Sequence, residues 1–300
     1  MKILLFGKDG QVGWELQRSL APLGELISLD VNSQNLCGDF SNLDGLAQTI
    51  RAVAPDIIVN AAAHTAVDKA ESEIELARTI NALAPGVLAN EAKRSNAWLV
   101  HYSTDYIFDG SGEKAWTESD PTGPLSVYGK TKLEGEQAIC ASGCKHLIFR
   151  TSWVYGARGG NFAKTMLRLA QERDSLNVIN DQIGAPTGAD LLADVTAHAI
   201  RASQLHPELS GLYHLVAAGE TSWYGYASFV LDFAQRAGLS LKVAPDTIKP
   251  EPTSAFPTPA KRPHNSRLDT AKLQNSFGLH LPQWQNGVAR MLTEILERQS

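Results

Sequence analysis

The residues best suited to acid–base chemistry are a tyrosine and a lysine one helical turn apart. Tyr128 and Lys132 form a Y-x-x-x-K pattern, which places both side chains on one face of a helix. A phenol has an ordinary pKa near ~10, and a nearby ammonium group favours its ionised form. In a reduction, the same tyrosine can protonate the oxygen that becomes an alkoxide as hydride arrives. Such pairs are common on exposed helices, so this one gains weight from the Ser103-Thr104 hydroxyls, twenty-four residues upstream of the tyrosine.

Three glycines near the N-terminus could hold a phosphate group. Gly7, Gly10 and Gly13 form G-x-x-G-x-x-G directly after an apolar run at residues 2–6. A side chain here would block the close approach of a pyrophosphate, and the following helix presents N–H groups and a partial positive charge to it. The pattern alone is weak, because glycines often only make turns. The strand pattern before it and the amphipathic pattern after it favour a dinucleotide site.

Acidic residues follow the next two predicted strands. Asp30 comes after residues 25–29 and could accept both ribose hydroxyls of an adenosine, while repelling a 2′-phosphate. Lys8 could reach that phosphate, so we expect both NADPH and NADH to serve. Asp39-Phe40 follows a short predicted third strand and suits the amino edge and face of adenine. A helix-entry aspartate and a core phenylalanine explain this pair equally well.

These residues need a sheet whose strands end at one edge. Short apolar runs alternate with helical patterns, which predicts an α/β protein with a Rossmann-type, doubly wound parallel sheet. We expect residues 1–150 to form mainly the dinucleotide-binding domain. Residues 151–300 would form mainly a smaller substrate-binding lobe, with some elements returning to the first domain. The predicted strands include 2–6, 25–29, 56–62, 97–102, 147–151 and 176–179, and helices are expected from Ser41 and at 68–94, 160–173 and 189–203.

Composition excludes several classes of protein. The chain of 300 residues is 43% hydrophobic and 20% charged, which is typical of a globular protein and not of disorder, collagen or coiled coil. A net charge of −5 without a basic tract argues against nucleic acid as a partner. No apolar run approaches the ~20 residues of a membrane span, and the N-terminal run is too short for a signal peptide. Three cysteines make no disulfide framework, so we expect a cytoplasmic protein.

The order of these motifs resembles the extended short-chain dehydrogenase/reductase superfamily. Within it, the chain closely resembles the family of dTDP-4-dehydrorhamnose reductases over nearly its whole length. That resemblance implies reduction of the C4 ketone of dTDP-4-dehydro-β-L-rhamnose to dTDP-β-L-rhamnose, for a bacterial surface polysaccharide such as lipopolysaccharide O-antigen. The stretches that carry it are NAAAHTAVDKAE (60–71), STDYIFDG (103–110), TSWVYG (151–156), DQIGAPT (181–187) and RPHNS (262–266).

The resemblance also implies roles for single residues. Tyr128 would be the proton donor, Lys132 its electrostatic partner and ribose anchor, and Thr104 a modulator of the proton. Thr104, Asp105 and Trp153 would meet the dTDP-sugar. His64 stands where the family often has another aromatic residue, and we assign it no proton-transfer role. The implied cofactor contacts are Gly10, Gln11 and Val12 at the pyrophosphate, Asp30 at the ribose, Asp39-Phe40 at adenine, and Ala63, His64 and Thr65 beside the cofactor.

The family further implies a homodimer with Mg²⁺ held by acidic side chains at the interface. Glu15 is a candidate ligand, although a solvated helix carboxylate explains it better. Two other functions stay open. A nucleotide-sugar epimerase of the same superfamily shares the Tyr–Lys pair, and a non-catalytic NADP-binding regulatory subunit shares the fold. A dehydratase is disfavoured, because Thr104 is followed by Asp105-Tyr106 instead of the Asp-Glu pair of those enzymes.

Overall fold

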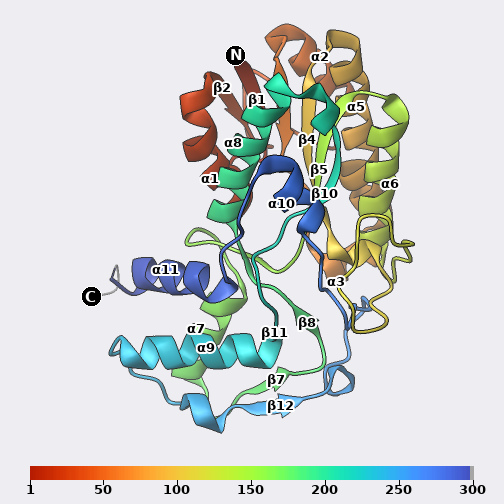
Figure 1. The fold of residues 1–300 in the computed structure, drawn as a ribbon. Coiled ribbons are helices and arrows are strands. Elements are labelled where there is room, and N and C mark those ends of the chain that lie inside the picture. Colours follow the sequence, from red (N-terminus) through yellow and green to blue (C-terminus); the bar gives the residue numbers. More distant parts are fainter. Residues whose placement is uncertain (298–300) are drawn as a thin grey trace.

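The centre of the protein is a parallel sheet of six strands in the order β10-β5-β4-β3-β1-β2 (Figure 1). The computed structural model describes residues 1–297. This architecture confirms the predicted Rossmann-type α/β class. The strands of the sheet are β1 (Lys2–Phe6), β2 (Glu25–Leu29), β3 (Ile57–Asn60), β4 (Trp98–Thr104), β5 (Lys145–Thr151) and β10 (Gly211–His214).

Helices cover both faces of this sheet, which explains why its strands are apolar on both sides. In β1, Ile3 and Leu5 belong to the core on one face, and Leu4 and Phe6 belong to the core on the other. The first core is completed by α1 (Gln11–Leu20), α8 (Ala189–Leu205) and α10 (Ala271–Phe277), and the second by α2 (Leu43–Val53), α5 (Ala84–Ser95) and α6 (Val127–Ser142).

A smaller lobe with its own hydrophobic core lies below the sheet in Figure 1. Its main helices are α7 (Phe162–Glu172), α9 (Trp223–Arg236) and α11 (Trp284–Glu297). The proline-rich stretch 245–263 supplies β12 (Lys249–Glu251), which pairs with β7 (Asn177–Ile179) in a two-stranded sheet, where an edge position tolerates proline. Two further pairs are β6 (Val154–Tyr155) with β9 (Thr187–Gly188), and β8 (Ile183–Gly184) with β11 (Thr221–Ser222).

The predicted third strand before Asp39 does not form. Residues 30–41 are turns and irregular backbone, because this polar stretch has too few apolar residues to bury. The helix expected from Ser41 is α2, and it begins one residue later than a Ser41 N-cap would place it. Its N-cap is Asn42, whose side chain accepts a hydrogen bond from the Gly45 N–H at 2.9 Å, and Ser41 stays outside.

The predicted helix at 68–94 is divided into several pieces. α3 (Val67–Ala70) and α4 (Ile74–Arg78) lead into a π-helical turn at Thr79–Leu83, and α5 follows. Pro85 stands in the first turn of α5 and has no N–H to continue an α-helical hydrogen-bond pattern from the preceding turn.

The second half of the chain differs from the prediction in its strands. Residues 177–179 form β7, but this strand belongs to the smaller lobe and not to the main sheet. The sixth strand of the sheet is β10, which the sequence did not indicate. β10, α8 and α10 therefore bring residues of the second half into the sheet layer.

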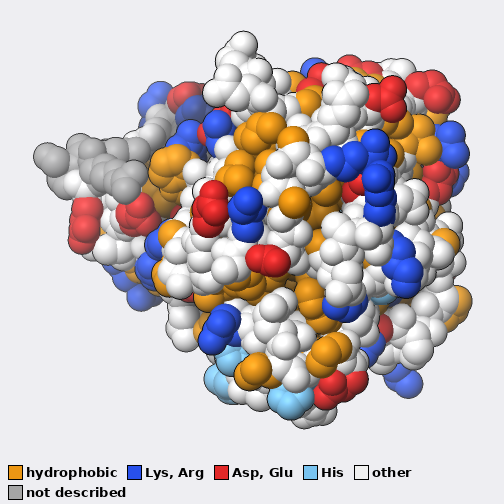
Figure 2. Space-filling model, turned by 90° about the horizontal axis from the view of Figure 1, so that it is seen from above, with side chains coloured by type: hydrophobic (Ala, Val, Ile, Leu, Met, Phe, Trp, Pro, Cys, Tyr) orange, Lys and Arg blue, Asp and Glu red, His pale blue; other side chains and the backbone are white. Residues whose placement is uncertain are grey.

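The surface shows no concentration of one charge on the face seen from above. Figure 2 shows acidic and basic side chains interspersed among polar and apolar ones on this face. Within residues 1–297, no helix is both long and apolar enough to cross a bilayer.

Candidate active site

A cavity of about 640 Å³ opens where five strands of the sheet end. The loops after β1 to β5 line it, for example at Gly7, Asp30, Ala61, Asp105 and Ser152. Loops at the carboxyl edge of an open parallel sheet form a crevice where the strand order reverses, here between β1 and β3. On the opposite side the cavity borders the smaller lobe, where Trp223, the first residue of α9, lines it. The cavity therefore lies between the sheet and the lobe.

Most of the residues predicted from the sequence line this cavity. Gly13 and His64 do not. The His64 ring turns to Glu73, with 2.8 Å between Nε2 and Oε2, so only its neighbours face the cavity. The predicted residues that line it are Gly7, Gly10, Gln11, Val12, Asp30, Asp39, Phe40, Ala63, Thr65, Thr104, Asp105, Tyr128, Lys132 and Trp153.

The glycine turn depends on two positions where no side chain fits. Gly7 has a φ of +83°, and a Cβ on it would lie 2.7 Å from the backbone of Ala61. A Cβ on Gly13 would lie 1.9 Å from the Gly7 carbonyl oxygen, so this glycine packs α1 against the turn. Gly10 is the N-cap of α1 and offers no side-chain acceptor. The first N–H groups of α1 are left available to an anion.

Asp30, the carboxylate predicted to meet the ribose, lies close to hydrogen-bond donors, to the positive charge of Lys8 and to a second carboxyl group. Asp30 Oδ1 accepts hydrogen bonds from the Ser33 hydroxyl at 2.9 Å and from the Asn32 N–H at 3.1 Å. Lys8 Nζ lies 3.8 Å from the same oxygen. A side-chain hydrogen bond with Asp9, helped by Ser33 and Lys8, holds the pKa of Asp30 below its ordinary value. The lysine charge is thus partly offset before any phosphate arrives.

The residues predicted to meet adenine also have structural contacts. Asp39 Oδ1 accepts a hydrogen bond from the Ser41 N–H at 2.8 Å, which stabilises the turn before α2. Phe40 is only 4% exposed and packs edge-on to Phe6, with ring centroids 5.5 Å apart. Both residues still border the cavity.

Tyr128 lies in the first turn of α6, which Ser126 caps by accepting a hydrogen bond from the Gly129 N–H at 3.1 Å. Its side chain shares a hydrogen bond with Thr104, whose hydroxyl also donates to Asp105 Oδ1 at 3.1 Å. Burial raises the pKa of Tyr128 to about 12. The sequence argument expected the nearby ammonium to favour the phenolate, but burial has the larger effect on the pKa of Tyr128 and favours the phenol.

The Lys132 side chain reaches the carboxyl-terminal part of β4. Its side chain is 2% exposed, and Nζ donates to the Tyr102 carbonyl oxygen at 2.5 Å and lies 3.2 Å from His101 Nε2. Burial lowers the pKa of this lysine to about 8, against the opposing charge of Glu136.

Asp105 is a buried carboxyl group beside the tyrosine. Burial raises the pKa of Asp105 to about 6, although hydrogen bonds from Ser266 and Thr104 oppose this. Ser266 belongs to the RPHNS stretch, so this segment contributes to the site from the far end of the chain. A carboxylate here can accept hydrogen bonds from sugar hydroxyls.

One wall of the cavity is a pair of stacked indoles. Trp153 stacks on Trp223, and Trp223 Nε1 donates to Gln182 Oε1 at 3.0 Å. Trp153 was predicted as a substrate contact, whereas Trp223 was not. The second tryptophan opens α9 in an aromatic-rich stretch, WYGYASF, which is equally typical of a core helix.

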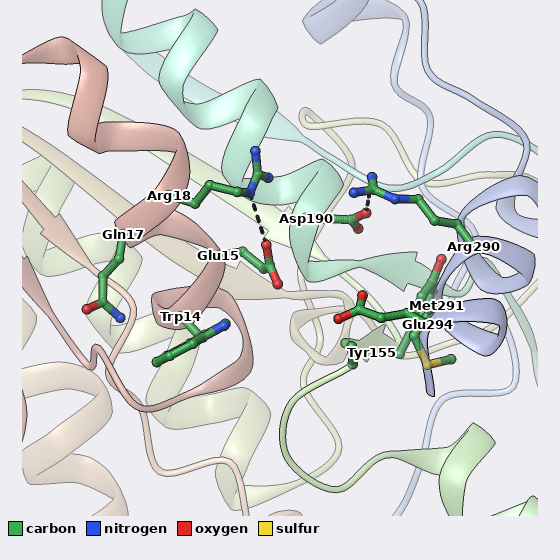
Figure 3. Close-up of a pocket in the computed structure, with 11 residues that line it drawn as sticks. Trp14, Glu15, Gln17, Arg18, Tyr155, Asp190, Arg290, Met291 and Glu294 are labelled. Carbon is green, nitrogen blue, oxygen red and sulfur yellow. Dashed lines mark hydrogen bonds and ion pairs between the residues drawn. The ribbon is translucent and has the colours of Figure 1, made fainter. Parts of the chain in front are cut away.

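Glu15 lies outside this cavity, in a pocket of about 390 Å³ between α1 and α11 (Figure 3). Asp190 and Glu294 also line that pocket. Glu15 faces Arg18, with 3.3 Å between Oε2 and Nε, and Asp190 faces Arg290, with 3.1 Å between Oδ2 and Nη1. Among the described residues, no group of three Asp, Glu, His or Cys could hold a metal ion. The described residues 1–297 of one chain therefore do not assemble the implied Mg²⁺ site.

Comparison with known proteins decides the family. The family model described as RmlD substrate binding domain matches residues 1–297. The chain belongs to this family. The dTDP-4-dehydrorhamnose reductase of Salmonella typhimurium, a curated relative, is 63% identical over 295 residues, which cover 98% of each chain.

Solved structures agree with this membership of the RmlD family. A dTDP-4-dehydrorhamnose reductase from Clostridium acetobutylicum is 37% identical, with a TM-score of 0.90, over 99% of this chain and 100% of that one. One from Bacillus anthracis, in complex with NADP, is 33% identical, with a TM-score of 0.86, over 98% and 99% of the two chains. The resemblance drawn from the motifs is confirmed.

Proposed function

We propose that this chain reduces the C4 ketone of dTDP-4-dehydro-β-L-rhamnose to the alcohol of dTDP-β-L-rhamnose, using a nicotinamide cofactor. The observation that carries this proposal is a single cavity that joins the glycine turn to Tyr128, Thr104 and Lys132. The names of the relatives supply the sugar, and the Bacillus anthracis structure supplies the cofactor class.

The glycine turn and the start of α1 would bind the cofactor's pyrophosphate, and Asp30 its ribose. Asp39-Phe40 would meet adenine, and Ala63 and Thr65 would pass beside the cofactor. When held by these residues, the nicotinamide would supply the hydride that C4 of the sugar accepts. Each of these chain segments borders the same cavity, which supports the assignment.

Tyr128 would donate its phenolic proton to the sugar O4 as negative charge develops there. Its raised pKa, about 12, keeps this proton in place at neutral pH, as a proton donor requires. Thr104 would orient the phenol, and Lys132 in its ammonium form would stabilise the phenolate that remains. Asp105 and Trp153 would position the sugar between the sheet and the lobe, with residues 1–150 mainly binding cofactor and 151–300 mainly binding substrate.

Both NADPH and NADH should serve as cofactors. Asp30 disfavours a 2′-phosphate, whereas Lys8, 3.8 Å from it, favours one. The two effects oppose each other at the same ribose. Steady-state kinetics should give specificity constants of similar size for the two cofactors, and a preference of many orders of magnitude would contradict this part of the proposal.

We further propose a cytoplasmic homodimer. Cys37, Cys140 and Cys144 are all free thiols, which suits a reducing compartment. Trp14 is 44% exposed next to the pocket of Glu15, and such a residue is typical of an interface. Because one chain gathers too few ligands, a Mg²⁺ site here requires acidic side chains of a second copy. Sedimentation velocity with and without a chelator tests both points. A dimer that dissociates on chelation supports a shared ion. A dimer and a reaction rate that are both unchanged by the chelator would contradict the proposed Mg²⁺ site.

A coupled assay tests the proposed function. Enzymatically made dTDP-4-dehydrorhamnose and NADPH should give loss of absorbance at the nicotinamide band and dTDP-rhamnose as the product, in equal amounts. An epimerase would consume no net cofactor, and a regulatory subunit would bind NADPH without turnover. The comparisons favour neither alternative. Cofactor oxidation without rhamnose formation would point to another keto-sugar.

A further inference from the structure

Three buried polar side chains form a continuous chain behind the catalytic tyrosine. Asn60 ends β3, His101 lies in β4 and Lys132 lies on α6, and each is at most 2% exposed. Asn60 Nδ2 lies 2.9 Å from His101 Nδ1, and His101 Nε2 lies 3.2 Å from Lys132 Nζ. Both ring nitrogens thus have one polar partner each. The reaction outlined above uses the lysine but neither of the other two.

The orientation of the Asn60 amide is fixed by the backbone. Its Oδ1 accepts a hydrogen bond from the Ala62 N–H at 3.0 Å, so its NH₂ group must face the imidazole. Reversing the amide would set two donors against each other, which is costly for buried groups. His101 Nδ1 therefore accepts the hydrogen bond.

This assignment determines the state of the imidazole. A neutral imidazole that accepts at Nδ1 carries its proton at Nε2. The Nε2–H then points at Lys132 Nζ. Burial and the lysine also hold the pKa of His101 well below its ordinary value, so the ring stays neutral. An N–H donor facing an ammonium group is repulsive, whereas an amine nitrogen can accept from it.

We propose that Asn60 holds His101 as the neutral Nε2–H tautomer, and that His101 is a positioning residue that favours the amine form of Lys132. The other groups facing the lysine are the Tyr102 carbonyl of β4 and Glu136 of α6, and Tyr128 lies one helical turn earlier on α6. Glu136 is engaged by Arg150 of β5, with 2.7 Å between Oε2 and Nη2. The carboxylate favours the ammonium form, and the imidazole opposes it. Burial lowers the pKa of the lysine to about 8, and together with this balance it leaves the lysine able to gain or lose a proton near neutral pH.

The inference rests on the proposed function only for its effect on the rate. Reduction needs the ammonium form beside the phenolate, so the rate should fall at alkaline pH as Lys132 loses its proton. Any change that gives His101 a free Nε2 acceptor would extend activity to higher pH.

Nitrogen NMR of cofactor-free protein tests the tautomer without any turnover. In ¹⁵N-histidine-labelled protein at neutral pH, His101 should show a protonated Nε2 and an unprotonated Nδ1. Its signals are identified by their loss in His101→Phe. A protonated Nδ1, or an imidazolium, overturns the proposal. The tautomer itself is read from the wild-type chain, and His101→Phe serves only to assign the signals. Where that variant does not fold, through-bond correlation of the ring with the His101 backbone assigns them instead.

Asn60→Asp should reverse the tautomer. A carboxylate accepts from Nδ1–H, which frees Nε2 to accept from the ammonium group, while an Oδ still accepts from Ala62 N–H. We expect the pKa of Lys132, followed by NMR of the labelled side chain, to rise by about one unit or more. The alkaline limb of kcat should move upward by the same amount. A reversed tautomer with an unmoved lysine pKa overturns the proposal.

Asn81→Asp is the matched control. Asn81 is also buried beside α6, where its Nδ2 donates to Thr131 Oγ1 at 3.2 Å, but it does not touch His101. Asn81→Asp should leave the tautomer of His101 unchanged and raise the pKa of Lys132 less than Asn60→Asp does. An equal rise in this pKa would show that the added charge causes the effect and would overturn the proposal. Failure of the coupled assay would remove the reductase function and leave the NMR result unaffected.

Discussion

Trp153 and Trp223 stack face to face, with ring centroids 3.6 Å apart and planes inclined by 14°. Trp153 holds this position with a φ of +50°, a left-handed conformation that costs a non-glycine residue about 1–3 kcal/mol. The stack and a hydrogen bond from the Thr187 N–H to the Trp153 carbonyl, at 3.2 Å, offset that cost. The lobe therefore fixes the residue proposed to meet the sugar.

Replacing Trp223 should weaken sugar binding more than cofactor binding. Trp223→Ala removes the surface behind Trp153, and an aromatic pair contributes about 0.5–1.5 kcal/mol beyond its buried area. We expect KM for the keto-sugar to rise about tenfold, with KM for NADPH little changed. Trp223→Phe keeps a stacking ring and should retain most of the affinity. Equal effects of the two variants on the sugar KM would contradict the role given to the stack.

Asp105 should make stability fall as the pH rises. Its pKa is about 6 in the folded protein and close to the ordinary value of 3.8 in the unfolded chain. The folded state holds the proton longer, so this stabilisation is complete below about pH 4 and is lost as the pH rises through 6. The total loss is about 3 kcal/mol.

Asp105→Asn removes that dependence. Urea unfolding at pH 4 and pH 8 should show the variant gaining about 3 kcal/mol relative to wild type between the two pH values. A difference between variant and wild type that stays constant over this range would show that burial does not disfavour the carboxylate.

The buried ion pair of Glu136 and Arg150 should matter for stability and for the pH profile. Three hydrogen bonds of 2.7–3.2 Å join the two side chains. Glu136→Gln leaves the guanidinium buried without its charge partner and should cost about 3–5 kcal/mol. It also removes a charge that raises the pKa of Lys132, so the alkaline limb of kcat should move to lower pH.

Glu134→Gln provides the comparison. Glu134 pairs with Arg78 at 2.8 Å, but both side chains are more than 40% exposed, so this change should cost only about 0–1 kcal/mol. Thermal and urea unfolding measure both variants. Similar losses for the buried and the exposed pair would be inconsistent with this description.

Sequence patterns predicted the elements that are continuous along the chain. The run before Gly7 is a local pattern, and the spacing of Tyr128 and Lys132 was enough to place both on one face of a helix, which is α6. β10 could not be found in this way, because only two residues of GLYH are buried and its partner β5 lies more than sixty residues earlier. The prediction of a strand before Asp39 was wrong. The Asp39-Phe40 motif suggested a strand before it, but the stretch has too few apolar residues to form one.

Side-chain partners were harder to predict than backbone elements. His101 lies inside an apolar run and gives no sign that it faces Lys132, since the contact depends on how β4 packs on α6. Trp223 carries no signal that separates a cavity wall from a core helix. His64 follows the expected backbone, but its ring turns away because Glu73 offers a partner.

The most direct test of the account is the rate of Tyr128→Phe. Tyr106→Phe is the matched control, because that ring packs edge-on to Tyr128 with centroids 5.5 Å apart and borders the same cavity. We expect Tyr128→Phe to lower kcat for dTDP-4-dehydrorhamnose by about 10²-fold or more, with NADPH affinity largely kept, and Tyr106→Phe to change kcat far less. A Tyr128→Phe enzyme with a nearly wild-type kcat would contradict the assignment of the proton donor.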